Sequence, residues 1–223
     1  YRQNRVADYA RYDLPAIGAF VHEQSGQAAH WIGHSLGGIT LAAALGGQYI
    51  DESVVASAAF FGTQVSRTYW PLKIPPVEWG GRFILKRFAQ LSGSRLKRGP
   101  EDEPIGLALE SMRWYGLFGR FGDADKGWWA GLAEVQVPVL AVSAAGDHQD
   151  PTWACRKLFE QIGSEHKQFV NLGRDQGFAD NFGHVEMLVS KAAQAEVWPL
   201  VARWLVDQRT ALLPGQADLA AAV

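Results

Sequence analysis

Short apolar runs alternate with helical patterns along most of this chain, and no other feature constrains its fold as strongly. Ala28–Ile32 and Val54–Phe61 are two such runs, too short for buried helices and of the right length for buried strands. Between them, Leu36–Leu45 is rich in Ala and Leu and stops at a Gly-Gly pair, as helices often do. Because strands that alternate with helices form parallel sheets, we expect an α/β protein with a mostly parallel, doubly wound sheet in three layers.

The same alternation returns in the second half of the chain. Val137–Ser143 and Lys167–Leu172 are predicted strands, and Thr152–Ile162 between them has a helical pattern. Two longer helices are predicted at the ends, Ala7–Gln24 and Lys191–Gln208. Pro15 should kink the first of them or mark a new first turn. The closing helix is expected to bury one face carrying Trp198, Val201 and Leu205.

Between residues 62 and 131 the strand-like runs give way to a segment crowded with aromatic residues. It holds 11 aromatic side chains and carries 11 Lys or Arg against 7 Asp or Glu, whereas the remainder of the chain carries 10 against 16. Helical patterns fit Gly81–Leu91 and Ile105–Phe118. We therefore predict a core made of residues 1–61 and 132–210, an inserted helical cap at 62–131, and a tail at 211–223.

One short motif carries the chemistry that the sequence predicts. Gly33-His34-Ser35-Leu36-Gly37-Gly38 follows a predicted strand and opens a predicted helix, which is the context of a nucleophile elbow. Such a turn leaves little room beside the serine, which explains Gly33 and Gly37, and it lifts the hydroxyl of Ser35 off the sheet. The backbone N–H of Leu36, at the start of the helix, is the expected donor to an oxyanion.

A serine nucleophile needs a histidine base, and the base needs a carboxylate that orients it. Asp147 and Asp150 both follow a late predicted strand, and His184 lies in a loop after the last one. The order Ser, Asp, His is the one that this strand–turn–helix context requires. The catalytic candidates are therefore Ser35, His184 and one of the two aspartates.

In these motifs the chain resembles the α/β-hydrolase superfamily, and within it the serine esterases and lipases. The resemblance spans nearly all of residues 7–208 and favours Asp147 over Asp150, because Pro138 and Pro151 match the ends of the family's acid motif. It implies that residues 62–131 cover the site. It also implies an ester as substrate and no metal or organic cofactor.

The chain departs from the family at its start. Members have several strands before the elbow strand and a loop that supplies a second oxyanion donor, but only one helix precedes the elbow here. The resemblance therefore implies the later part of an α/β-hydrolase fold. We expect the second donor to lie outside these 223 residues, in a missing N-terminal segment or a second chain, and one edge of the sheet to be exposed.

The surplus of aromatic residues suggests a substrate with an apolar group. We expect a pocket bordered by His34, Phe61, Trp70 and Trp128 that binds a small apolar ester. Thioesters, lactones and C–C bonds remain alternative targets, because the same triad cleaves them. A non-catalytic binding module of hydrolase fold is the alternative from a different class.

Composition excludes several other classes of protein. The net charge of −2 gives no reason to expect nucleic acid as a partner, and no run of 18 apolar residues is present, so stable membrane insertion is not expected. A single cysteine, Cys155, excludes an intramolecular disulfide and a cysteine-cluster metal site. The compartment stays open, with the cytoplasm as the default, and an oligomer is possible.

A loop histidine and a run of basic residues each have a structural and a functional interpretation. His148, flanked by acids, is interpreted as an exposed loop residue rather than a metal ligand. A run of basic residues in the cap is interpreted as the solvated face of a helix, with an anionic head group or membrane surface as the alternative. The run consists of Arg82, Lys86, Arg87, Arg95, Lys97 and Arg98.

Overall fold

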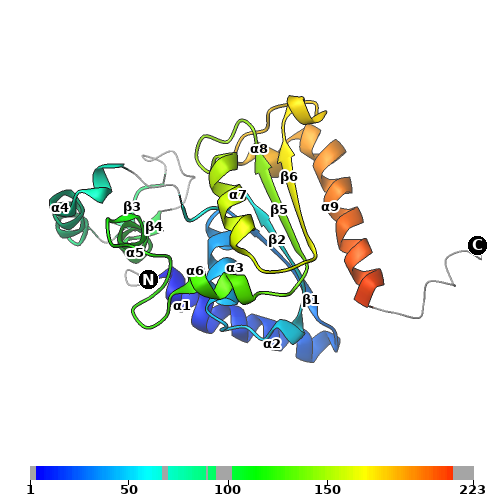
Figure 1. Cartoon of the computed structure of the whole chain (residues 1–223), viewed down its shortest axis with the longest axis horizontal. Helices are drawn as coiled ribbons and strands as arrows, with labels where there is room; N and C mark the ends of the chain where they lie inside the picture. The colour runs from blue at the N-terminus through cyan, green and yellow to red at the C-terminus, as the bar shows by residue number, and fades with distance from the viewer. Residues whose placement is uncertain (1–3, 67–69, 89, 94–101, 213–223) are drawn as a thin grey trace, which may run out of the picture.

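The computed structural model of the chain describes residues 4–66, 70–88, 90–93 and 102–212, with side chains described as far as residue 208. The expected tail therefore lies almost wholly outside the described residues, as do Tyr69 and the end of the basic run at residues 95–98. Figure 1 shows a central sheet with helices on both faces and a smaller group of elements, around α4 and α5, to one side.

The sheet has four parallel strands, which confirms the expected α/β class. They are β1 (Ala29–His34), β2 (Val55–Phe61), β5 (Val139–Ala144) and β6 (Lys167–Leu172), in the spatial order β1-β2-β5-β6. No other strand among the described residues pairs with the outer edge of β1. The side chain of Ile32 on this edge strand is 54% exposed.

Burial on both faces makes β2 the centre of the fold. All seven of its residues are buried. Ala58 and Phe60 belong to the apolar cluster on one face, whereas Ala59 and Phe61 belong to the cluster on the other. Because successive side chains of a strand point to opposite faces, a strand covered on both sides reads as one continuous apolar run.

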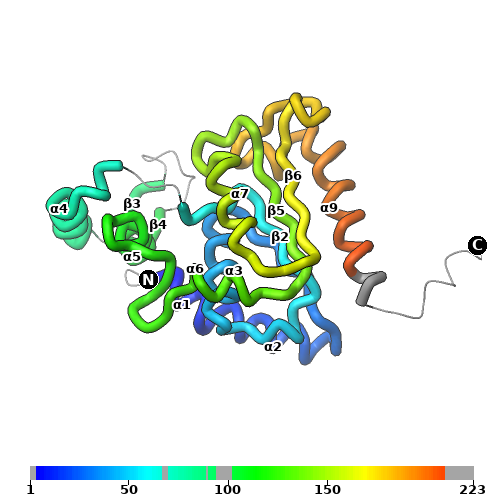
Figure 2. Tube along the Cα trace, in the orientation of Figure 1, coloured from blue at the N-terminus to red at the C-terminus, as the bar shows by residue number. Residues whose placement is uncertain are grey.

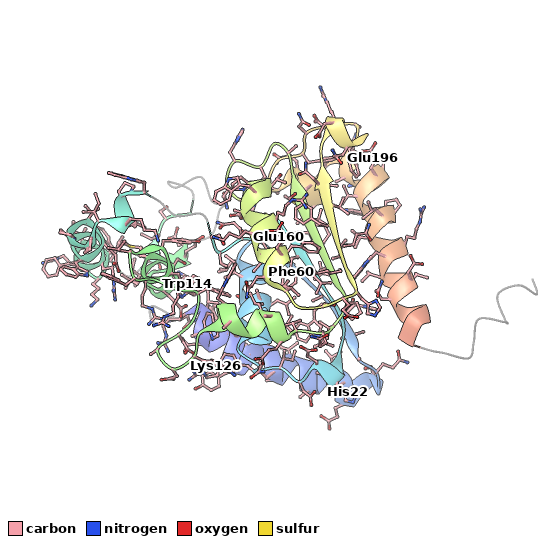
Figure 3. All side chains as sticks on the ribbon, viewed as in Figure 1. His22, Phe60, Trp114, Lys126, Glu160 and Glu196 are labelled. Atoms are coloured by element: carbon pink, nitrogen blue, oxygen red, sulfur yellow. The ribbon has the colours of Figure 1, made fainter. Side chains whose placement is uncertain are left out.

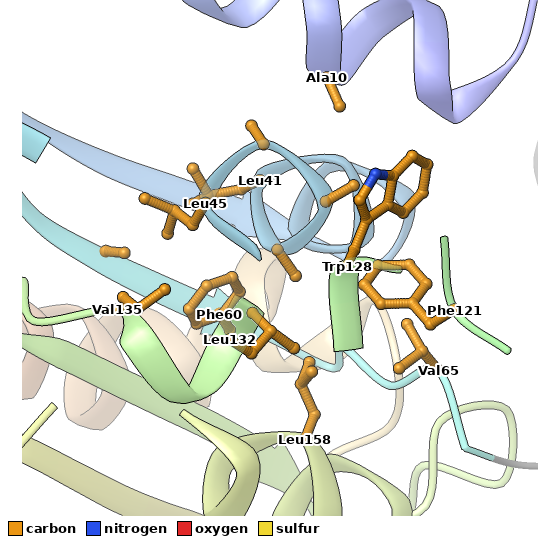
Figure 4. Close-up of a cluster of buried hydrophobic side chains, with 14 of the residues drawn as sticks. Ala10, Leu41, Leu45, Phe60, Val65, Phe121, Trp128, Leu132, Val135 and Leu158 are labelled. Atoms are coloured by element: carbon orange, nitrogen blue, oxygen red, sulfur yellow. The ribbon is translucent and has the colours of Figure 1, made fainter. Parts of the chain in front are cut away.

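The two faces are covered by different helices, which gives the three expected layers (Figures 1 and 3). One face packs against α3 (Leu36–Gly46) and α7 (Thr152–Gln161), and the other against α9 (Lys191–Leu212). Phe60 lies inside the first layer, and Figure 4 shows it among Leu41, Leu132 and Leu158. Among the described residues, no helix combines the length and the apolar character needed to cross a bilayer.

The first helical segment is divided into three consecutive parts. It consists of α1 (Val6–Asp8), a π-helical turn over Tyr9–Asp13, and α2 (Leu14–Ser25). Pro15 stands in the first turn of α2, where its missing N–H costs nothing. Of the two expected outcomes, a kink or a new first turn at Pro15, the structure shows the new first turn, preceded by the wider π-helical turn.

The closing helix buries Val201 and packs Leu205 against the sheet, as expected, but leaves Trp198 exposed. Trp198 is 53% exposed, and the buried positions are Ala193, Val197, Val201 and Trp204. These residues recur at helical spacing and pack against the β-sheet cluster. The expectation for Trp198 was wrong because its ring lies across the α8–α9 corner, where its Nε1–H donates to the carbonyl of Leu188 at 2.8 Å.

Within 62–131 the chain forms short helices and a small hairpin (Figure 2). The helix α4 spans Pro75–Leu85, so it starts and ends about six residues before the expected 81–91. Pro75 and Pro76 occupy its first turn, which proline favours, and Gln90–Leu91 pairs instead with Glu103–Pro104 as β3 and β4.

The remaining elements of this segment are a 3₁₀ turn at Trp70–Lys73, α5 (Ile105–Tyr115) and α6 (Trp128–Gly131). The other short elements are 3₁₀ turns at Glu52–Val54, Leu132–Glu134 and Arg174–Gln176, and α8 (Glu186–Val189).

The end of this segment is anchored in the core by aromatic side chains. Trp128 is fully buried, and its ring makes edge-to-face contacts with Trp114 and Phe121, with centroids 5.8 and 5.1 Å away. Figure 4 shows Trp128 and Phe121 side by side near α3. The Nε1–H of Trp128 donates to the hydroxyl of Tyr49 at 3.2 Å. These contacts tie α5 and α6 to the sheet layer.

We predict that Trp128→Ala lowers the free energy of unfolding by about 3–5 kcal/mol, the usual cost of removing a buried aromatic side chain. Trp153→Ala is the matched control, because Trp153 is 58% exposed and its loss should cost well under ~1 kcal/mol. Urea denaturation of both variants measures the difference. Equal costs would mean that Trp128 does not anchor the cap.

Candidate active site

Ser35 sits in a strained turn between β1 and α3. Its backbone has φ 52° and ψ −118°, a region that residues with a side chain rarely adopt. The N–H of Ser35 donates to the carbonyl of Phe61 at the end of β2, at 2.9 Å. This bond holds the turn against the carboxyl ends of the strands, where ligand sites of open α/β sheets form.

Two glycines make this turn possible. A Cβ on Gly33 would lie 2.7 Å from the Cα of Gly38, and a Cβ on Gly38 would overlap the side chain of Thr63. Gly37, by contrast, has open space beside it. The sequence-based explanation was right for Gly33 and wrong for Gly37, because the crowded neighbour in the helix is Gly38.

Asp147 lies just beyond β5 and is only 3% exposed. Its Oδ1 accepts the backbone N–H groups of Gln149 and Asp150, at 2.9 and 2.8 Å. Its Oδ2 accepts the Nδ1–H of His184 at 2.8 Å. Burial would raise the pKa of Asp147, but these hydrogen bonds and the charge of His184 outweigh it and hold the pKa below its ordinary value.

Asp150 is the second carboxylate near His184, and the structure gives it a different set of contacts. Its Oδ2 lies 3.7 Å from Nδ1 of His184, too far for a hydrogen bond. Its Oδ1 accepts the side-chain amide of Gln64 at 3.0 Å. Asp147 is therefore the carboxylate that is hydrogen-bonded to His184, and Asp150 lies next to the ring without such a bond.

His184 lies in the loop between β6 and α8 and is held from two sides. Its backbone carbonyl accepts the Nε2–H of His34 at 2.9 Å, and the two rings are 4.5 Å apart. Burial alone would lower the pKa of His184, but the hydrogen bond and charge of Asp147, followed by the charge of Asp150, hold the pKa above its ordinary value. Burial and then the charge of His184 lower the pKa of His34, which favours its neutral form.

The remaining ring nitrogen of His184 faces an amide. Nε2 lies 3.3 Å from the side-chain nitrogen of Gln149, which can only donate, so Nε2 acts as an acceptor. Nδ1 carries the proton and Nε2 the lone pair, as a general base requires. Within the part of the chain that the structure describes, no hydrogen bond joins the hydroxyl of Ser35 to this nitrogen.

A cavity of about 550 Å³ opens beside Ser35. Most of its lining side chains are aliphatic, and Ser35, Gln64, Gln149 and Asp150 are among the polar ones. Such a cavity, apolar with a few convergent polar groups, is typical of small-molecule sites. The other lining residues are Leu36, Ile39, Leu72, Leu85, Leu91, Glu103, Leu107, Ala108, Ser111, Met112 and Tyr115.

None of the four expected pocket residues lines this cavity. Trp128 is buried in the core, and Trp70 is 73% exposed. Phe61 is buried against the opposite face of the sheet, and His34 packs on the ring of His184. Of the 11 aromatic residues in the 62–131 segment, Tyr115 alone is among the lining residues, because the others that the structure describes pack in the core or face solvent. The aliphatic side chains of α4 and α5 that line the cavity were not predicted from the sequence. Their recurrence at helical spacing was the pattern that could have indicated them.

Leu36 is the first residue of α3, so its backbone N–H has no acceptor within the helix. It also lines the cavity next to Ser35, where an oxyanion donor is needed. The second donor expected from outside the chain stays a prediction. So do the catalytic roles of Ser35, His184 and Asp147.

Several solved structures of lipases and esterases resemble this chain. A monoacylglycerol lipase from Paleococcus ferrophilus matches with a TM-score of 0.60 at 15% identity, over 92% of this chain and 77% of the other. A thermophilic esterase from Thermogutta terrifontis matches with a TM-score of 0.55 at 17% identity, over 92% and 73%. The chain has the α/β-hydrolase fold. A metagenome-derived lipolytic enzyme matches this fold too, with a TM-score of 0.60 at 17% identity, over 93% and 74%. No family model and no curated protein matches this sequence.

The same residues are also the candidates for a metal site in this α/β-hydrolase fold. Asp147, Asp150 and His184 have potential ligand atoms within 4.8 Å of one another, and His148 is not among them. The proton on Nδ1 of His184 leaves no lone pair there for a metal, so the arrangement suits proton transfer better. Cys155 is buried, and burial raises the pKa of its thiol to about 12, which keeps it protonated and unreactive.

We predict that Asp147→Asn and Asp150→Asn both lower the pKa of His184, the first more strongly. Each carboxylate favours the charged imidazolium, and the Asp147 oxygen is closer to Nδ1, at 2.8 against 3.7 Å. NMR titration of the His184 ring protons measures the shift. Asp207→Asn, an exposed change on α9, is the control and should leave the titration unchanged. A pKa that rises in either site variant would contradict the assignment.

Proposed function

We propose that this chain is a serine hydrolase that cleaves carboxylic esters with an aliphatic acyl group. The observation that carries the proposal is the Asp147–His184 hydrogen bond, packed beside the strained elbow of Ser35 at one end of an aliphatic cavity. The resemblance to lipases and esterases of the same fold supports this reaction class. The lipase and esterase activities are those of the compared proteins, and at 15–17% identity the likeness concerns the fold.

In the proposed first step, Nε2 of His184 takes the proton of the Ser35 hydroxyl as the oxygen attacks the ester carbonyl. The carbonyl oxygen becomes an oxyanion, which the N–H of Leu36 stabilises at the start of α3. Asp147 remains ionised and stabilises the imidazolium, in keeping with its lowered pKa. His184 then gives the proton to the leaving alcohol, and an acyl-enzyme remains.

In the second step, water attacks the acyl-enzyme. His184 removes a proton from the water and returns it to the Ser35 oxygen as the carboxylic acid leaves. In this structure Nε2 of His184 faces the side-chain amide of Gln149 at 3.3 Å. Both steps therefore require Nε2 to leave this amide and to accept a hydrogen bond from Ser35 or from water. We propose that the side chain of Gln149 gives way when substrate brings the Ser35 hydroxyl and Nε2 together.

The shape of the cavity supports an aliphatic acyl group rather than an aromatic one. Leu72, Leu85 and Leu91 from the cap face Leu36 and Ile39 from the helix behind the serine. Each methylene that such a wall buries adds about 0.8 kcal/mol, or roughly a fourfold gain in binding. Thioesters and lactones share the chemistry, and acyl-chain preference does not separate them from esters.

We predict that a fluorophosphonate probe labels Ser35 stoichiometrically and that Ser35→Ala abolishes both labelling and ester hydrolysis. Loss of a triad nucleophile lowers kcat by about 10⁶-fold. Ser111→Ala is the matched control, since Ser111 lines the same cavity but its hydroxyl donates to the carbonyl of Leu107. It should label like the unmodified chain. Absence of labelling in the unmodified chain would leave the non-catalytic binding module as the better account.

We predict that kcat/KM for p-nitrophenyl esters rises from acetate toward octanoate until the cavity is filled, by roughly fourfold per methylene. Ala108→Leu should move the preferred acyl chain to a shorter length, because Ala108 lines the cavity on α5. Ala202→Leu, on the exposed face of α9, is the control. Rates that are flat, or that fall steadily beyond acetate, would exclude the acyl pocket.

A further inference from the structure

A second cavity, larger than the one at Ser35, lies on the other side of the cap helices. Its volume is about 960 Å³, and it shares no lining residue with the first. The two cavities meet opposite faces of α5: Gly106, Leu109 and Arg113 line this one, whereas Ala108, Met112 and Tyr115 line the other. Figure 1 shows the first turn of the chain, α1, close to α5 on this side of the molecule.

Cationic side chains dominate the wall of this second cavity. Arg5 comes from the N-terminal segment, Arg82, Lys86 and Arg87 from α4 and the turn that follows it, and Arg113 from α5. Two carboxylates also line it, those of Asp8 and Glu110. The other lining residues are Asn4, Phe88, Ile105, Gly106 and Leu109.

Neither carboxylate forms an ion pair with a basic side chain of α4, although the charge of Arg113 acts on Glu110. Asp8 is paired with Arg5 at 2.8 Å within its own turn. Glu110 is buried and its carboxylate accepts the backbone N–H of Ala7 at 3.4 Å, while burial raises its pKa. Among the residues that the structure describes, Lys86, Arg87 and Arg113 form no ion pair. These three positive charges therefore line the cavity without an ion-paired carboxylate among the described residues.

Two of the arginines are held in place by groups that leave most of their donors available. The guanidinium of Arg87 stacks over the ring of Phe83, 3.9 Å from its centroid, and one of its N–H groups donates to the Phe83 carbonyl. Arg113 donates through Nη2 to the carbonyl of Gly122 at 2.9 Å. A guanidinium that is already oriented loses little freedom when it binds an oxyanion, and its planar fork matches phosphate.

Beside these charges, α4 and its following turn expose large apolar side chains. Trp79, Phe83, Ile84 and Phe88 are each more than half exposed, and Phe88 itself lines the cavity. An exposed apolar group of this size beside a basic cavity fits a ligand that has both an anionic and an apolar part. A purely solvated helix face, as interpreted from the sequence, would not need these rings.

We propose that the cavity between α1, α4 and α5 binds the phosphate group of an anionic ligand, through Lys86, Arg87 and Arg113. The phosphate can belong to a phospholipid head group or to a soluble phosphate compound. The apolar side chains on α4 suit the lipid source. This site is separate from Ser35, and its existence does not depend on the proposed ester hydrolysis.

Two binding measurements on the full chain separate the two sources. Calorimetry with inorganic phosphate tests a soluble anion, and co-sedimentation tests vesicles of phosphatidylcholine with and without phosphatidylglycerol. Vesicle binding that requires phosphatidylglycerol identifies a lipid head group, and phosphate binding without vesicle binding identifies a soluble ligand. Either result should weaken with added salt, because the attraction is between charges. Binding of neither phosphate nor anionic vesicles overturns the proposal.

Three variants connect the binding to this cavity. Lys86→Gln with Arg87→Gln should weaken whichever binding is seen by at least about tenfold, since each basic group near an anionic surface contributes several-fold. Lys191→Gln with Arg203→Gln removes the same charge from the exposed face of α9 and should bind like the unmodified chain. Glu110→Gln removes a negative charge from the cavity wall and should strengthen binding. Binding that is equally weakened in the α9 control, or undiminished in the α4 variant, overturns the site.

Discussion

The close approach of β1 to the helix that follows it is the constraint on which the rest of the site depends. A Cβ on Gly33 would clash with the backbone of Gly38, a Cβ on Gly38 would clash with Thr63, and the turn between the two glycines holds Ser35 at φ 52°. The bond from the Ser35 N–H to Phe61 at the end of β2 fixes that turn to the centre of the sheet. A strained residue persists only where its surroundings determine it fully, and here both neighbouring strands do so.

The proposed acid and base come from the ends of later strands of the same sheet. In a parallel sheet the carboxyl ends of all strands meet at one edge, so Asp147 after β5 and His184 after β6 are brought to the end of β1. His34, one residue before the serine, donates to the backbone of His184 and thus links elbow and base directly. The fold therefore assembles the proposed site from three separate parts of the chain without a specialised loop.

Two dissimilar cavities lie on opposite faces of α5. The aliphatic face of α5 looks toward Ser35, and the face with Arg113 looks toward the basic cavity. Trp128 and Phe121 pack residues 62–131 against the core, and among the described aromatic residues of that segment Tyr115 alone lines the cavity beside Ser35. Apolar and charged residues at helical spacing on one short helix are enough to give its two faces different binding properties.

The sequence by itself determined the strands, their parallel arrangement and the residue types of the site, because these follow from local patterns. An all-apolar Val54–Phe61 run can be buried on both faces as a strand, and Gly33-x-Ser35 between a strand and a helix predicts the elbow. The residues alone leave Asp147 and Asp150 open, the resemblance to the family's acid motif favours Asp147, and the structure puts Asp147 nearer the histidine. What only the tertiary structure decided are contacts between distant segments: Gly38 against Thr63, Trp128 in the core, and aliphatic residues of α4 and α5 around Ser35. The physical reason is that an aromatic or aliphatic residue packs equally well in a core or a pocket wall, and only the arrangement of the layers selects between them.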